Sequence, residues 1–138
     1  MSRISAGLLH RCDAAGCTAK AFTPGIDVPA DWARREAVAD GQEHTNRDMV
    51  GIDLCNRHVN WHASHEPLLP GFIQFEIVGD ALILSRLLAC SGCDWATRPR
   101  LPTGSAEERS TLLSRAWLDH LSRLSAVEAA EVLPLEAM

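Results

Sequence analysis

Four residues in the first half of the chain have the types and the spacing of ligands for one metal ion. Four residues separate Cys12 from Cys17, so a turn between them can point both thiolates the same way. Two residues separate Cys55 from His58, which suits ligands in the first turn of a helix. Zinc prefers four tetrahedral nitrogen and sulfur ligands in structural sites, and three cysteines with one histidine are a standard set. The spacing therefore predicts one structural Zn²⁺ bound by these four side chains.

Two other interpretations of these residues stay open. The cysteines can be buried free thiols, since free cysteine is often buried and inert, with His58 at the surface. The same thiolates can also hold an iron–sulfur cluster, although a histidine ligand fits zinc better. Under the zinc interpretation, a two-cysteine turn, a hairpin and then ligands at a helix start are the arrangement of a treble-clef fold. A zinc ribbon is the close alternative.

A second candidate metal site lies in the second half of the chain. Cys90 and Cys93 follow a predicted hairpin, and His120 lies in a predicted helix, so these three residues resemble the ligands of a ββα finger-like site. A finger helix usually supplies a second histidine about three to five residues further on, and this chain has none there. His62 or His65 from the first half, or a water molecule, can complete the ligand set.

The histidines and the second cysteine pair also allow other chemistry. Cys90-x2-Cys93 can be a tight turn with reduced thiols, or a redox dithiol, although the βαβ context of a redox motif is missing from the sequence. His58, His62 and His65 would share one face of a helix, as in a catalytic metal site. No carboxylate stands at the HExxH spacing, so we expect a structural His58 and two solvated histidines.

Composition restricts the class of protein. The chain has 138 residues, which suits one domain or two very small ones. Its five cysteines are an odd number, and the sequence starts without a secretory apolar stretch, so metal binding is favoured over a disulfide framework. The longest apolar stretch, 81–90, is interrupted by Arg86 and is shorter than the roughly 20 residues of a membrane helix. We therefore expect a cytoplasmic protein with no membrane segment.

The charge and the motifs exclude further functions. The net charge of −5 counts against non-specific binding of nucleic acid, which relies on Lys and Arg to neutralise phosphates. The sequence contains no Gly-rich phosphate loop and no GxSxG motif. Composition and motifs therefore favour a protein without a catalytic constellation.

Local patterns predict the elements that carry the candidate ligands. We expect strands at 18–22, 32–39 and 49–54, with a turn at Asp40-Gly41, and a short helix from 56 to about 64. Residues 72–78 and 81–88 predict a hairpin whose Gly79-Asp80 turn is of type II′. Ser105 and Glu108 form a capping box before an amphipathic helix. A second capping box at Ser125 and Glu128 predicts a separate short tail helix.

Prolines and a glycine between 65 and 71 mark a linker. The predicted fold class is therefore α+β, with a treble-clef or zinc-ribbon-like module at 1–66 and a ββα finger-like module at 71–138. Below about 70–80 residues, a hydrophobic core rarely supplies more than ~3–5 kcal/mol, and a structural Zn²⁺ can contribute on the order of 10–16 kcal/mol. Modules of this size are therefore expected to depend on metal.

Two stretches resemble small, largely uncharacterised zinc-binding proteins of actinobacteria and their phages. "RCDAAGCTAKA" followed by "DLCNRH" carries the resemblance over about residues 8–66, and "CSGCDW" with "AWLDHL" carries it over about 88–122. The second stretch departs from the pattern because its fourth ligand is absent. The resemblance implies a non-enzymatic accessory or regulatory role, with a gene on a mobile element as one setting.

These observations favour a non-enzymatic regulatory or adaptor protein that binds a protein partner. One alternative is a nucleic-acid-binding transcriptional regulator, for which Arg34-Arg35 and Arg98-x-Arg100 are the local basic features. The other alternative is a metal-dependent enzyme that uses the second site, because three protein ligands leave the open position that a catalytic zinc needs. The oligomeric state cannot be predicted from these patterns.

Overall fold

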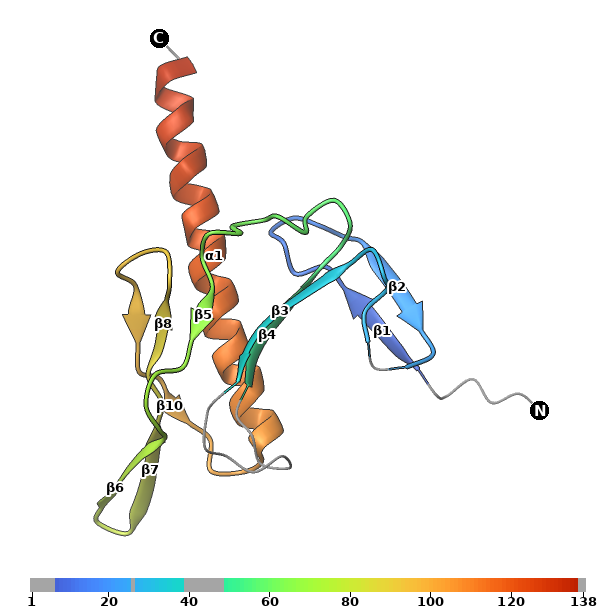
Figure 1. Cartoon of the computed structure of the whole chain (residues 1–138). Coiled ribbons are helices and arrows are strands. Elements are labelled where there is room, and N and C mark those ends of the chain that lie inside the picture. Colours follow the sequence, from blue (N-terminus) through green and yellow to red (C-terminus); the bar gives the residue numbers. More distant parts are fainter. Residues whose placement is uncertain (1–6, 26, 39–48, 137–138) are drawn as a thin grey trace, which may run out of the picture.

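A computed structural model describes residues 7–25, 27–38 and 49–136, with side chains described up to residue 126. Within these ranges the chain is a strand-rich α+β protein in which short strands precede one long helix (Figure 1). The elements in chain order are β1 (Leu8–Arg11), β2 (Lys20–Thr23), β3 (Ala33–Val38), β4 (Met49–Leu54), β5 (Pro67–Leu68), β6 (Gln74–Val78), β7 (Ala81–Ser85), β8 (Leu88–Cys90), β9 (Ala96–Thr97), β10 (Arg100–Leu101) and α1 (Ala106–Glu136).

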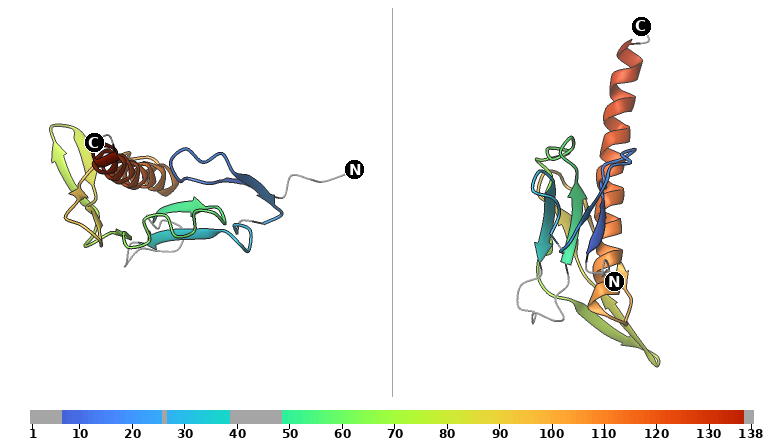
Figure 2. Two further views of the ribbon diagram at one scale, coloured as in Figure 1. Left: turned by 90° about the horizontal axis from the view of Figure 1, so that it is seen from above. Right: turned by 90° about the vertical axis from the view of Figure 1, so that its right-hand side faces the viewer.

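The strands form small antiparallel sheets arranged along the helix. β1 pairs with β2 and β3 pairs with β4, while the two three-stranded sheets have the orders β5-β8-β9 and β10-β7-β6. Seen from above, the sheets lie in a curved row beside α1, and the carboxyl-terminal turns of α1 extend beyond them (Figures 1 and 2). No helix of the described ranges combines the length and the apolar character needed to cross a membrane.

The core forms between β4 and α1. Successive strand side chains point to opposite faces, so Val50, Ile52 and Leu54 all point inward from β4 and are at most 3% exposed. Residues four apart share one face of a helix, and α1 buries a matching row. That row is Leu113, Trp117 and Leu121. One core therefore draws side chains from both sides of the Pro-rich segment at 65–71.

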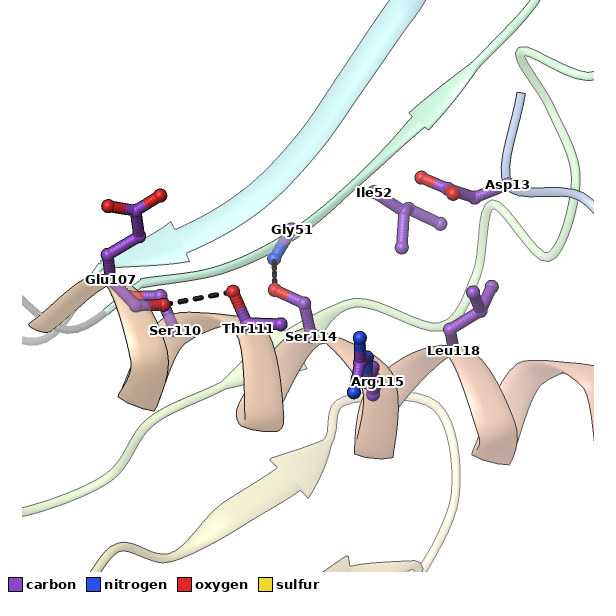
Figure 3. A pocket seen from close by; sticks show the side chains of 9 residues that line it. All are labelled: Asp13, Gly51, Ile52, Glu107, Ser110, Thr111, Ser114, Arg115 and Leu118. Carbon is purple, nitrogen blue, oxygen red and sulfur yellow. Dashed lines mark hydrogen bonds between the residues drawn. The ribbon is translucent and has the colours of Figure 1, made fainter. Parts of the chain in front are cut away.

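Serine side chains of α1 protect the outer edge of β4. The backbone N–H of Gly51 donates to Ser114 Oγ at 3.0 Å (Figure 3). The backbone N–H of Met49 donates to Ser110 Oγ at 2.9 Å. Alternate residues of a strand direct their N–H groups to the same edge, and residues four apart in a helix lie one turn above each other. Two residues along β4 therefore match one turn of α1. The N–H groups of Met49 and Gly51 are satisfied in this way without a further strand.

Removal of one of these hydroxyls tests the edge contact. We expect Ser114→Ala to lower the free energy of unfolding by about 1–2 kcal/mol, because the N–H of Gly51 loses its acceptor in a half-buried place. Denaturant unfolding of the metal-loaded protein measures the change. Thr111→Ala is the matched control, since that exposed hydroxyl donates only to Glu107 O of its own helix. Equal effects of the two variants would contradict the edge contact.

Several predicted elements are confirmed. β3 and β4 occupy the predicted strand ranges, and β6 and β7 form the predicted hairpin. Gly79 has a φ of 63°, as the first turn position of a type II′ turn requires. Ser105 Oγ accepts the N–H of Glu108 at 3.1 Å and caps α1. The turn predicted at Asp40-Gly41 lies outside the described residues.

The short helix predicted from 56 to 64 is wrong. This segment is a series of turns closed by hydrogen bonds between residues three apart, such as Trp61 N to His58 O at 2.9 Å. Carbonyls that a helix would use internally are taken by Arg35 of β3, which donates to Val59 O at 2.7 Å and to Trp61 O. A tertiary contact thus replaces the local helical pattern.

Two predictions for the second half are also wrong in detail. α1 does not break at the second capping box but runs on to Glu136, and Ser125 Oγ instead bonds His62 Nε2 at 2.7 Å. The hairpin that carries the cysteines is not the predicted one, because β7 ends at Ser85 and Cys90 lies in β8, which pairs with β5 and β9. The predicted finger-like module therefore combined a hairpin and a cysteine pair that belong to two separate sheets.

Candidate metal centres

The first cluster joins the β1–β2 hairpin to the end of β4. Cys12 and Cys17 lie in the turn between β1 and β2, and Cys55 and His58 follow β4. Their ligand atoms all lie within 4.8 Å of one another. The structure thus brings together the four residues predicted as the first ligand set.

The distances within this cluster fit a tetrahedral ion. Zinc bonds of about 2.3 Å to sulfur and about 2.0–2.1 Å to nitrogen place sulfur atoms about 3.8 Å apart, and sulfur about 3.6 Å from nitrogen. The Cys17 and Cys55 sulfurs are 3.8 Å apart, and His58 Nδ1 lies 3.7 Å from the Cys12 sulfur and 3.3 Å from the Cys55 sulfur. Ligands of a multi-iron cluster bind different iron atoms and stand further apart. The geometry therefore suits a single ion.

The surroundings of the sulfurs shift their ionisation in opposite directions. Burial raises the pKa of Cys12 to about 11. Burial also opposes ionisation of Cys55, but hydrogen bonds from His58, the Arg57 backbone N–H and the other two thiols together lower its pKa to about 6. A bound cation stabilises every coordinated thiolate and reverses the effect of burial. The backbone N–H of Ala19 donates to the Cys17 sulfur at 3.5 Å, a contact that orients this side chain.

The second cluster joins three separate segments. Cys90 ends β8, Cys93 lies in the turn between β8 and β9, and His120 projects from α1. The fourth member is His65, from the segment before β5, and the four ligand atoms lie within 4.8 Å of one another. His65 Nδ1 is 3.1 Å from the Cys90 sulfur, and His120 Nε2 is 3.4 Å from the Cys93 sulfur. Cys90 and His120 are buried, whereas Cys93 is exposed.

The sequence left His62 and His65 as candidates for the fourth ligand of the second site, and the structure places His65 there. His65 faces the cysteines, while His62 has a positive φ of 48° and bonds Ser125. His58 belongs to the other cluster. The three histidines therefore do not share one helical face, and the three-histidine catalytic interpretation is wrong. The signal for His65 was weak in the sequence because the spacing to Cys90 spans a linker and a hairpin.

Aromatic packing holds His120 in place. The Trp95 ring stacks on the His120 ring with centroids 4.2 Å apart and an interplanar angle of 8°. Trp117, which is fully buried, lies 5.5 Å from the same ring. Burial and the nearby His65 and His62 rings lower the pKa of His120, which favours the neutral imidazole that metal binding requires. Leu113 and Trp117 belong to the hydrophobic core, and Trp95 packs against it.

The basic pair Arg34-Arg35 has partners within the fold. Arg34 donates to Asp53 Oδ1 at 2.8 Å, and Arg35 binds carbonyls within the fold. The first basic pair is therefore at least partly occupied by internal contacts.

Comparison with known proteins adds no relative. No protein-family model, curated protein or solved structure matches the chain.

Proposed function

We propose that the chain is a non-enzymatic regulatory or adaptor protein, stabilised by two Zn²⁺ ions, that binds a protein partner. The exposed hairpin β6–β7 is the observation that carries the proposal. Its apolar side chains Phe75 and Ile77 are 71% and 72% exposed, while the core between β4 and α1 is closed. We place the protein in the cytoplasm, where thiols stay reduced and available to metal.

The donor sets support zinc in structural sites. Three thiolates with one imidazole, and two thiolates with two imidazoles, are both standard structural zinc sets. Each cluster offers four protein atoms, so the tetrahedron is complete without water. A catalytic zinc keeps one position open, which makes the enzymatic alternative weaker than a structural role. The order of two-cysteine turn, hairpin and ligand-bearing turns supports a treble-clef-like first module.

The groove between β4 and α1 also favours a structural role. It has a volume of about 310 Å³ and is lined by polar side chains, including Ser110, Ser114 and Glu107 (Figure 3). The two serine hydroxyls accept backbone N–H groups of β4. These hydroxyls are committed to the fold and are not paired with a histidine base, as a nucleophile would be.

The hairpin supports protein binding as the role. Figure 1 shows β6 and β7 projecting away from the other sheets. The exposed apolar residues in and around the hairpin are Phe72, Phe75, Ile77, Val78 and Leu82. They lie on both faces of the hairpin, and exposed apolar surface of this kind marks binding sites.

Metal content and partner capture test the proposal together. We expect two zinc equivalents per chain by elemental analysis, and two cobalt sites whose sulfur charge-transfer bands reflect three and two thiolates. We expect the immobilised protein to retain a binding protein, and Ile77→Lys to abolish that capture while both metals stay bound. Leu9→Lys is the control, because Leu9 is also an exposed strand residue, at 52%. Capture that survives Ile77→Lys, or a chain without metal, would contradict the proposal.

A further inference from the structure

The two most exposed apolar side chains, Phe75 and Ile77, belong to β6, and the same strand exposes Val78 on its other face. Phe75 and Ile77 of β6 pair with Leu84 and Leu82 of β7 and share one face of the sheet. Val78, which is 55% exposed, belongs to the opposite face. A partner that packs on only one face of the hairpin would leave the other apolar side chains in water. A strand added along the edge of β6 reaches both faces.

The free edge of β6 is suited to such an addition. β6 ends the order β10-β7-β6, so no described strand pairs with its outer edge. Every second residue of an edge strand turns its N–H and C=O groups outward. Natural edges are protected by bulges, prolines or charged side chains. β6 pairs with β7 in unbroken register, contains no proline, and carries Glu76 as its single charge. β10 pairs only with the end of β7, so the tip of the hairpin consists of β6 and β7 alone. A two-stranded hairpin is marginally stable by itself.

We infer that β6 pairs antiparallel with β6 of a second copy of this chain, so that the working unit is a dimer. The inference rests on the proposed protein-binding role of the hairpin and names its partner. Two-fold pairing is the commonest form of self-association. It would join two three-stranded sheets of the order β10-β7-β6 into one continuous sheet.

The side chains of β6 are compatible with self-pairing. Directly opposite residues of an antiparallel pair share a face, so the two-fold axis must pass beside a residue. An axis beside Glu76 would oppose two carboxylates and is disfavoured. An axis beside Phe75 places the two Phe75 rings together, Ile73 opposite Ile77, and Gln74 opposite Glu76 of the second copy. This register contains apolar pairs and a hydrogen-bonding pair but no like charges.

The exposed area also agrees with a dimer. A standard interface buries about 800 Å² per partner, and about 65% of a homodimer interface is apolar. Pairing along the β6 edge would bring Phe75, Ile77 and Val78 of the two copies together and bury part of their exposed apolar surface. Because the pairing edge is only five residues long, we expect weak association, with a Kd on the order of 10 μM.

Sedimentation velocity of the zinc-loaded full chain, from about 1 μM to about 200 μM, tests the dimer. We expect a concentration-dependent shift from monomer to dimer. Ile77→Lys should weaken the association at least about 30-fold, because a lysine at this edge opposes strand pairing. Leu9→Lys should leave it unchanged. Each variant should keep two metal equivalents, which shows that the metal-binding fold is intact.

A pair of substitutions at Gln74 tests the register. In the proposed arrangement, the lysine of Gln74→Lys lies opposite Glu76 of the second copy, and this pair occurs twice per dimer. The substitution should therefore lower the Kd about three- to ten-fold. Gln74→Glu should weaken it by a similar factor. Equal Kd values for the two variants would overturn this register.

The outcomes separate the dimer from the proposed function. A monomer at all concentrations that still captures another protein through Ile77 would overturn the dimer and leave the adaptor role standing. A monomer with no Ile77-dependent capture would overturn both. A dimer insensitive to Ile77→Lys would overturn the assignment of β6 as its interface.

Discussion

Replacing Cys55 with serine is expected to remove one of the two metal ions and to abolish cooperative unfolding of the amino-terminal strands. Cys55 is 1% exposed, and its sulfur lies close to both Cys17 and His58. A structural zinc contributes on the order of 10–16 kcal/mol, whereas the net stability of a folded protein is about 5–15 kcal/mol. Loss of this ion therefore removes a free energy as large as the stability itself.

Elemental analysis and thermal unfolding followed by circular dichroism measure this effect. The neighbouring Asn56→Ser variant is the control, because Asn56 is exposed and is not in the ligand set, and it should keep two metal equivalents and the wild-type transition. Exhaustive chelation of the wild-type chain should also remove the transition, and added zinc should restore it. A Cys55→Ser protein that melts like the wild type would show that packing alone holds this half together.

His65→Ala should release the second metal ion and leave the first in place, while His62→Ala should keep both. The two histidines stand three residues apart, but only His65 faces the cysteine pair, with Nδ1 3.1 Å from the Cys90 sulfur. Because this ion joins the segment before β5, the β8–β9 turn and α1, its loss should lower the free energy of unfolding by more than about 4 kcal/mol. His62→Ala should cost only about 1 kcal/mol, for its bond to Ser125.

Cobalt spectroscopy extends this test. In the His65→Ala protein the bands of the three-thiolate site should remain and those of the two-thiolate site should disappear. His65→Cys should restore the second ion with stronger sulfur charge-transfer bands, because a third thiolate replaces an imidazole. Loss of the second ion in His62→Ala instead would show that the ligand assignment is wrong.

Short-range features of this protein were determined by the sequence alone. The Cys12–Cys17 and Cys90–Cys93 spacings allow each pair of thiolates to converge within one turn, and the structure brings both pairs into four-residue clusters. The β6–β7 hairpin and the cap of α1 at Ser105 also follow from local residue preferences. Such features depend on backbone geometry over a few residues, so the surrounding fold leaves them unchanged.

Contacts between distant segments were decided only by the tertiary structure. The sequence left His62 and His65 as equal candidates, and the choice depends on how the turns after Cys55 are held. Those turns replace the expected helix because Arg35, from a different strand, takes their carbonyls. The exposure of β6 likewise depends on which sheet covers which face. Burial and partner choice are properties of the packed chain, since each is set by atoms that lie far away in sequence.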